Sequence, residues 1–290
     1  MRRRLVGAGL IVALLFALVV GRRLLTRLGL PAISDSTRET QALSHPALTD
    51  SSGLTRFGLP QGLKSQGRLL HRSAFECFHD PRLKVSRWVA YRAEGEDTTE
   101  LGRYSGGFFP DPDLSPGQRA ELVDYQGLWK QDRTGYDRGH QAPDATLRVF
   151  GLEAQRETYS LANITAQHSQ INQGAWADIE AELRRRSSRQ SPVWVITGPV
   201  FFADRETLRV GPDRVAVPHA YYAIADQGPG PAVVAFLVVN QAEAPWYGSL
   251  DRFLTSVDSV ERLTGLDFLS ELPDSLENRL EAARPRRLLP

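Results

Sequence analysis

The sequence has very little cysteine and no excess of charge of either sign. Its 290 residues include a single cysteine, Cys77, which excludes an intrachain disulfide and a zinc site built on cysteines. Lys and Arg total 35 and Asp and Glu total 34, so no overall basic field indicates nucleic-acid binding. A polyanion would have to be held by a local patch. The remaining composition, 41% hydrophobic and 24% charged, is ordinary for a globular protein.

The long apolar run of the chain lies at its N-terminus. Residues 5–21 are uncharged and apolar, at the short limit of the roughly 17–25 residues that a membrane-spanning helix needs. No small-x-small cleavage site follows, so we expect residues 1–27 to be an uncleaved membrane anchor, with a cleaved secretory signal as the alternative. Arginines flank the run on both sides and leave the orientation ambiguous. We expect an extracytoplasmic body, or secretion if the segment is cleaved.

The rest of the chain divides by composition into three parts. Residues 28–65 are rich in Ser, Thr, Pro and Gly and have no sustained period, which is typical of a flexible linker. A globular pattern begins near residue 66 and continues to about residue 275. We interpret 66–275 as the folded domain and 276–290 as a C-terminal tail.

Within that domain the pattern alternates between strands and helices. Four runs rich in β-branched and aromatic residues predict strands at 86–93, 192–201, 219–225 and 231–240. Apolar residues recur every four positions within 169–189 and predict a helix there, with Asn172, Trp176 and Glu180 on a neighbouring stripe. A second helix is predicted near 250–264, ending at Gly265. The order of strands and helices favours an α+β fold over a regular βαβ series.

One of the six histidines, His140, stands in the stretch TGYDRGHQAPDA, residues 134–145. Gly139 and Pro143 predict an irregular loop. A polar histidine in a loop is a candidate general base, because its pKa lies near working pH. The alternative is a capping or surface histidine.

Oxygen donors follow downstream of His140. Asn172 and Glu180 could hold a hard cation such as Mg²⁺, which keeps several waters and needs few protein ligands. Taken singly, Asn172 would be a helix cap, Glu180 a solvated acid and Trp176 a core residue.

Several ordered motifs occur together between residues 66 and 275. DRGH at 137–140 is followed by NIT-Q from 163 and by NQGAW-DIE at 172–180, and TGPVF at 197–201 comes next. In order and spacing these blocks resemble the DNA/RNA non-specific endonuclease family. The resemblance implies a ββα-metal fold, with a mostly antiparallel central sheet flanked by helices.

The resemblance also implies roles for three residues. His140 would be the general base that takes a proton from water. Asn172 would be the direct ligand of Mg²⁺, for which Mn²⁺ could substitute. Glu180, on the same helix as Asn172, would orient water around the metal.

Further residues match the family as supports or phosphate contacts. Asn163 would support the histidine and the phosphate geometry, and Arg138 would hold the site or contact phosphate. Arg103 is the best match for an upstream phosphate-binding arginine, although the spacing there differs from the family pattern. Arg184 and Gln167 are additional candidates for substrate contact, and a solvated surface position is the alternative for Arg184.

The function implied is a Mg²⁺-dependent endonuclease that cleaves DNA and RNA to 5′-phosphate products, with both a monomer and a homodimer left open. Two alternatives use the same fold: a noncatalytic module that binds nucleic acid or a partner, and a phosphodiesterase for smaller substrates. Two positions depart from the family pattern. Ala166 stands where proline is usual, and Ala223 stands where a lysine often contributes a basic contact to substrate.

Overall fold

The computed structural model describes a continuous body with short gaps. The described residues are 53–63, 66–95, 102–130, 135–228, 232–242 and 248–288. The expected anchor, residues 1–27, lies outside them, as does most of the expected linker. No helix within the described ranges combines the length and the apolarity that a membrane crossing requires.

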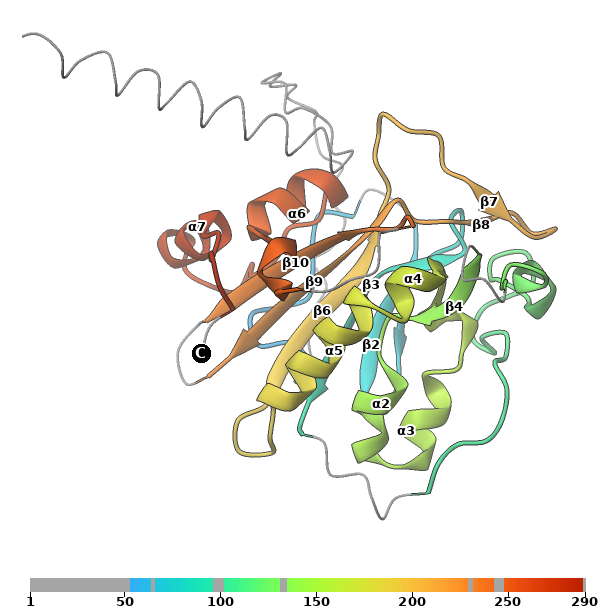
Figure 1. The fold of residues 1–290 in the computed structure, drawn as a ribbon, viewed down its shortest axis with the longest axis horizontal. Helices are drawn as coiled ribbons and strands as arrows, with labels where there is room; N and C mark the ends of the chain where they lie inside the picture. The colour runs from blue at the N-terminus through green and yellow to red at the C-terminus, as the bar shows by residue number, and fades with distance from the viewer. Residues whose placement is uncertain are drawn as a thin grey trace, which may run out of the picture. The chain divides into compact units, whose positions relative to one another are not determined.

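A seven-stranded sheet forms the centre of this body (Figure 1). Every pair of neighbouring strands is antiparallel. The strands, in their order across the sheet, are β1 (Arg68–His71), β2 (Phe75–Asp80), β3 (Val85–Ala93), β6 (Val193–Val200), β9 (Ala220–Gln227), β10 (Val233–Val239) and β11 (Leu254–Thr255). The four strands predicted from the sequence are β3, β6, β9 and β10, and all four are confirmed. All of β2 and nearly all of β9 are buried, because both faces of the sheet are covered.

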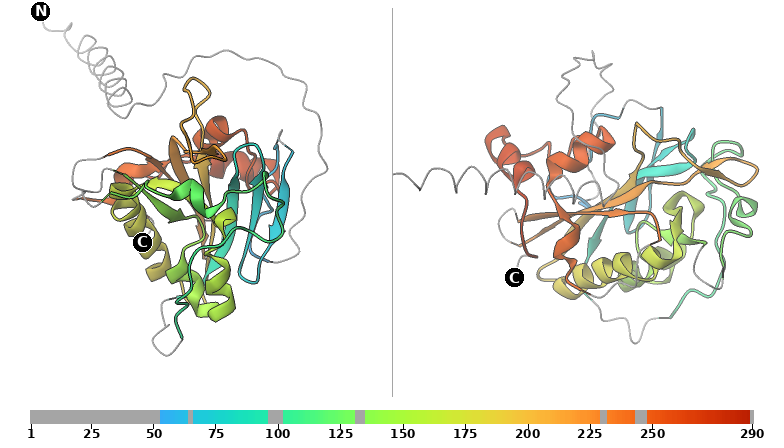
Figure 2. Two further views of the ribbon diagram at one scale, coloured as in Figure 1. Left: turned by 90° about the vertical axis from the view of Figure 1, so that its right-hand side faces the viewer. Right: turned by 45° about the horizontal axis from the view of Figure 1, so that its top comes forward.

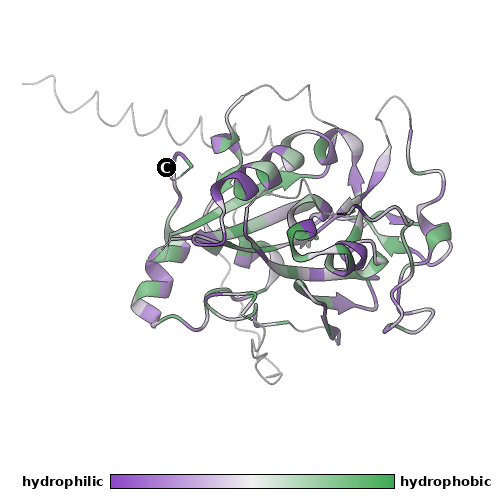
Figure 3. Cartoon of the chain, turned by 90° about the horizontal axis from the view of Figure 1, so that it is seen from below, coloured by the Kyte–Doolittle hydropathy of each residue, from purple (hydrophilic) through white to green (hydrophobic). Residues whose placement is uncertain are grey.

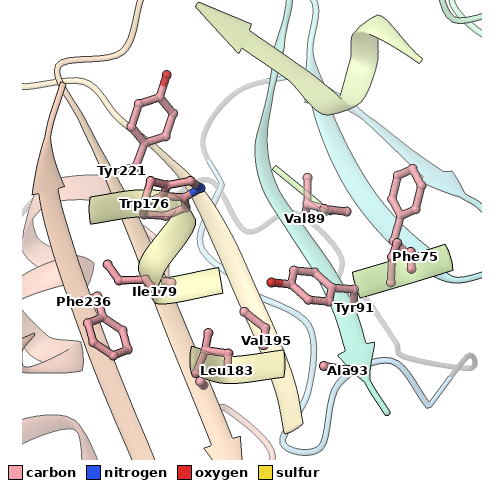
Figure 4. Close-up of a cluster of buried hydrophobic side chains, with 14 of the residues drawn as sticks. Phe75, Val89, Tyr91, Ala93, Trp176, Ile179, Leu183, Val195, Tyr221 and Phe236 are labelled. Carbon is pink, nitrogen blue, oxygen red and sulfur yellow. The ribbon is translucent and has the colours of Figure 1, made fainter. Parts of the chain in front are cut away.

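The two faces of the sheet carry different helices (Figures 1 and 2). On one face, Ile179 and Leu183 of helix α5 (Ala175–Arg186) pack with Tyr221 of β9 and Phe236 of β10 in a single apolar cluster (Figure 4). On the other face, the Tyr222 ring lies 5.5 Å from that of Phe268, just after helix α6 (Val257–Thr264). Adjacent residues of β9 thus serve opposite layers, as the two-residue period of a strand requires.

The remaining elements are short. The further helices are α2 (Asp144–Leu147), α3 (Leu152–Glu157), α4 (Ser169–Asn172) and α7 (Asp274–Ala282). Single 3-10 turns are η1 (Leu122–Tyr125), η2 (Arg148–Phe150), η3 (Leu161–Asn163) and η4 (Leu250–Phe253). Two small antiparallel ribbons pair β4 (Tyr136–His140) with β5 (Ile164–His168) and β7 (Arg209–Val210) with β8 (Val215–Ala216). Along the longer helices hydrophilic and hydrophobic residues alternate, as expected for helices with one buried face (Figure 3).

Two predicted helices differ in detail from the structure. The helix predicted over 169–189 is interrupted between α4 and α5, where Gly174 comes so close to the preceding turn that a Cβ would lie 2.5 Å from the Gln170 carbonyl oxygen. The stretch 250–264 begins with η4 and β11, and only its second half is helical. The predicted C-cap is confirmed, since Gly265 has a left-handed φ of 69°.

The folded body extends beyond residues 66 and 275. Leu59 is completely buried, and Gln61 pairs with Asp267 through backbone N–O distances of 2.8 and 3.1 Å. At the other end α7 runs through residues 274–282, across the boundary expected for a tail.

Candidate active site

The strand pair β4–β5 and the helices that follow it form the frame of the candidate site. The stretch around His140 is not the irregular loop that the sequence predicted, because Tyr136–His140 pair in register with Ile164–His168. Gly139 fits the strand because any Cβ there would collide with the Gln167 side chain. His140 is therefore the last residue of a strand, and α4 follows β5 directly, giving the order strand, strand, helix.

Aromatic rings surround His140. Its imidazole lies 5.4 Å from the Phe108 ring and 5.1 Å from the Tyr159 ring, which it meets nearly perpendicularly at 81°. The Nε2 atom is buried and has no hydrogen-bond partner among the described residues, and the residue as a whole is half-buried. Burial lowers the pKa of His140 to about 4, against the opposing effect of the Asp144 charge. The ring is consequently neutral at neutral pH.

Asn163 fixes the backbone immediately after His140. This fully buried side chain accepts a hydrogen bond from the Ala142 backbone N–H at 2.8 Å and donates to the carbonyls of Ala142 at 3.0 Å and Thr158 at 2.9 Å. Its own carbonyl accepts from the Gln141 N–H at 2.9 Å. With its amide fully engaged by the backbone, Asn163 is a positioning residue that holds the end of β4 in place.

Asp137, the first residue of DRGH, connects β4 to α4. Its Oδ1 accepts from the Ser169 hydroxyl at 2.6 Å, and its Oδ2 accepts from the side-chain amides of Asn172 and Gln173, both at 2.8 Å. A carboxylate only accepts hydrogen bonds, so it fixes Nδ2 of Asn172 on its own side. The Oδ1 of Asn172 then points away, and no described residue donates to it.

This orientation bears on whether the site fits a cation. A neutral amide oxygen without a donor is a suitable ligand for a hard divalent ion, so Asn172 fits that role. The sequence interpretation did not assign Asp137 a role. Its place at the start of DRGH was the available signal, but only the fold shows that it faces Asn172.

Glu180 lies on α5 beside two residues that interact with its charge. Burial raises the pKa of Glu180 to about 8, while Arg184 and the indole N–H of Trp176 favour the ionised form. Glu180 is not on the same helix as Asn172, contrary to the sequence expectation, because Gly174 separates α4 from α5. The two residues come from successive helices.

The residues predicted to contact substrate differ in their exposure to solvent. Arg138 is exposed, and its guanidinium carbon lies 4.4 Å from the centre of the Phe108 ring. Arg103 is also exposed, and its charge opposes the raised pKa of Tyr159, the neighbour of His140. Gln167 is buried with both amide atoms unpartnered, so its side chain does not reach the surface.

Comparison with known proteins identifies the family. The family model described as DNA/RNA non-specific endonuclease matches residues 50–275. The chain belongs to the DNA/RNA non-specific endonuclease family. It is 32% identical over 230 residues to a protein named Nuclease from Serratia marcescens, a match that covers 78% of this chain and 83% of that one. It is 30% identical over 230 residues to mitochondrial Endonuclease G from Homo sapiens, covering 76% and 74% of the two chains.

The fold agrees with that of a solved family structure. A chain from the crystal structure of the EndoG/EndoGI complex superposes with a TM-score of 0.63 at 25% identity, over 75% of this chain and 90% of that one. Sequence and fold together make the chain a hydrolytic nuclease of the DNA/RNA non-specific endonuclease family, with the expected α+β architecture.

The two departures from the family pattern both lie in the interior. Ala166 is completely buried on β5, and its carbonyl accepts hydrogen bonds from the Tyr221 hydroxyl and the Asn240 side chain, both at 3.1 Å. Ala223, only 2% exposed, belongs to the apolar cluster beneath α5. Because position 223 faces the core, the alanine there does not remove a contact to substrate.

The pH dependence of kcat/KM tests the environment of His140. A general base acts only when unprotonated, so with a pKa of about 4 the rate should stay constant as the pH falls from neutrality and decline only close to that value. The measurement is kcat/KM at fixed ionic strength, with circular dichroism at each pH to verify folding. An acid limb centred near about pH 6.5, as for imidazole in water, would contradict the buried neutral ring.

The variant Asp137→Asn tests the orientation of Asn172. Without the carboxylate the Asn172 amide is free to turn, and the concentration of divalent metal needed for half-maximal activity should rise about 10- to 100-fold. The matched control is Asp178→Asn, which removes an exposed carboxylate from the first turn of α5. An unchanged metal requirement in Asp137→Asn would show that this hydrogen bond does not position a ligand.

Proposed function

We propose that the chain is a Mg²⁺-dependent endonuclease that cleaves phosphodiester bonds of both DNA and RNA and leaves 5′-phosphates. The observation that supports this most directly is the Asp137–Asn172 hydrogen bond, which presents an amide oxygen from α4 beside the strand that ends in a neutral His140. A base and a ligand for a hard cation are thus held by one small ββα unit.

In this proposal His140 removes a proton from the attacking water. A neutral imidazole has one nitrogen without a proton, and the lone pair of that nitrogen can accept the proton of the water. General-base action of this kind typically contributes about 10²- to 10⁴-fold to the rate. Asn163 keeps the ring in place through the backbone of residues 141–142, without contacting substrate itself.

Asn172 would hold the Mg²⁺ through Oδ1. When bound, the cation would supply Lewis-acid stabilisation of charge that develops on the phosphate and on the departing oxygen. Glu180 of the following helix, α5, would accept hydrogen bonds from water at that end of the site. The water-orienting role proposed for Glu180 does not require its ionised form, because its pKa of about 8 keeps it largely protonated at neutral pH and below, and a protonated carboxyl both donates and accepts hydrogen bonds.

The arginines at the rim would bind phosphate. Arg138 and Arg103 are both exposed on the side of the aromatic residues that surround His140, and Arg184 lies one turn beyond Glu180. Guanidinium groups bind phosphate oxygens with charge-assisted hydrogen bonds. Contacts to phosphate carry no information on base sequence, which supports cleavage without sequence preference.

Digestion of plasmid DNA and of RNA tests the proposed function. Wild-type protein should cut both polymers with Mg²⁺ and neither with excess chelator. The variant His140→Ala should lose about 10²-fold or more in rate, and Asn172→Ala should require far more Mg²⁺. The controls His71→Ala and Asn278→Ala alter the same residue types at exposed positions on β1 and α7.

Each other outcome has a definite meaning. Hydrolysis of a small phosphodiester without cleavage of either polymer would favour the small-substrate alternative. Binding of nucleic acid without any hydrolysis would favour a noncatalytic module. Wild-type cleavage by both His140→Ala and Asn172→Ala would show that these residues are not the base and the metal ligand.

We also propose that residues 1–27 anchor the nuclease in a membrane with its body on the extracytoplasmic side, on the strength of the apolar run at 5–21. The full chain should then sediment with membranes and resist extraction by high salt. Protease added outside spheroplasts should digest the body. A body that is protected from protease, or a soluble secreted product that lacks residues 1–27, would contradict this arrangement.

A further inference from the structure

A group of acidic side chains lies between α6 and α7, on the face of the sheet opposite to α5. Its five members are Asp258 and Glu261 of α6, Asp267 in the following turn, and Glu277 and Glu281 of α7. The two helices lie next to each other in Figures 1 and 2. None of the five carboxylates forms an ion pair with a described residue. The nuclease function proposed above uses none of them.

Glu281 is the centre of this acidic group. It is only 7% exposed, and its Oε1 is buried without any hydrogen-bond partner among the described residues. It forms one triplet with Asp258 and Glu261 and a second with Asp267 and Glu277, and within each triplet the potential ligand oxygens lie within 4.8 Å of one another. A buried carboxylate oxygen with no donor, on a side chain that belongs to both triplets, lacks its partner.

The charges in the group disfavour one another. Burial and the charges of Glu261 and Glu277 raise the pKa of Glu281 to about 8. Burial also raises the pKa of Glu261, Asp267 and Glu277, with neighbouring carboxylates adding to the effect for Glu261 and Glu277. A cation bound to either triplet would offset the repulsion around Glu281.

We propose that this group is a second metal site, selective for Ca²⁺, in which Glu281 is the central ligand. The potential ligand oxygens of each triplet lie within 4.8 Å of one another, close enough for one ion with Ca–O bonds of about 2.4 Å to contact all three. Ca²⁺ takes six to eight oxygen ligands in flexible geometry, and carboxylates from two helices and a turn can supply them. Mg²⁺ instead needs near-octahedral geometry and retains water, so it should bind more weakly here.

The site would act on the stability of the C-terminal region. Its ligands join α7 to α6, and Asp267 also pairs through its backbone with Gln61 of the N-terminal segment. An ion bound there stabilises the native state by RT ln(1 + [Ca²⁺]/Kd). The bound state would therefore hold both ends of the described body against the sheet.

Thermal unfolding and calcium binding of the full chain test this site without reference to nuclease activity. In an Asn172→Ala background, which removes the ligand proposed for the active-site metal, Ca²⁺ should raise the Tm and bind with one ion per chain in isothermal titration calorimetry. Adding Glu281→Gln should weaken Ca²⁺ binding about tenfold or more, and Mg²⁺ at equal concentration should give a smaller shift in Tm. The matched control is Glu271→Gln, an exposed acid before α7 that lies outside the group.

The variant Glu281→Gln should fold, because the amide keeps the size of a carboxyl whose pKa of about 8 leaves it largely protonated at neutral pH. Glu277→Gln, at a half-buried position, gives a second measure of the same site and should also weaken binding. A Ca²⁺ response that is absent from the parent, or equal in Glu281→Gln and Glu271→Gln, would overturn the proposal. So would a Tm that increases as the pH falls through about 8 with no response to Ca²⁺, since shared protons would then explain the group. None of these outcomes affects the assignment of the nuclease site.

Discussion

The carboxylate of Asp137 is the interaction on which the arrangement of the active site depends. It receives hydrogen bonds from Ser169, Asn172 and Gln173, and so fastens the first turn after β5 to the strand that carries His140. Hydrogen bonds to an ionised acceptor are shorter and about twice as strong as those between neutral groups. Because a carboxylate cannot donate, the amide of Asn172 has one permitted orientation. The availability of its oxygen thus depends on Asp137 of β4, which lies outside the helix that carries Asn172.

The state of His140 has a different origin. In this site no carboxylate holds the imidazole, and the aromatic rings of Phe108 and Tyr159 remove it from water. A ring in such surroundings stays neutral, because protonation would place a charge where solvation is poor. The position of the ring depends on the backbone rather than on its own hydrogen bonds, and the buried amide of Asn163 fixes that backbone. Protonation state and position are thus set by separate parts of the structure.

The sequence predicted the periodic elements well and the local breaks poorly. Hydrophobic patterns in the sequence predict strands β3, β6, β9 and β10 and the buried stripe of α5, because the apolar residues of these patterns form the core. Strand β4 was missed because its aspartate and glycine have low strand propensity, and its pairing with β5 overrides them. The break at Gly174 depends on a close approach to Gln170 that no pattern displays.

Side-chain partnerships were the least predictable feature. Family motifs led to the proposal of His140, Asn172 and Asn163 as site residues, but the bond from Asp137 joins residues 35 positions apart and appears only after β4 pairs with β5. Gln167, a polar residue within a motif, was predicted to contact substrate, but its side chain is buried against Gly139. The acids of α6 and α7 resemble a solvated surface in the sequence, and only the fold shows that Glu281 is buried among them.

The two metal sites proposed for this chain differ in the number and the charge of their ligands. The active site offers one neutral amide oxygen and a neutral imidazole, so an ion there would keep most of its coordination open for water and phosphate, as turnover requires. The group around Glu281 offers carboxylates from three segments, so an ion there would be held mainly by protein oxygens. Few ligands and low charge suit a cation that must meet a substrate, whereas many ligands and high charge suit one that holds helices together. On this reasoning a chelator would act on the nuclease in two separable ways, through catalysis at α4 and through the stability of the α6–α7 region.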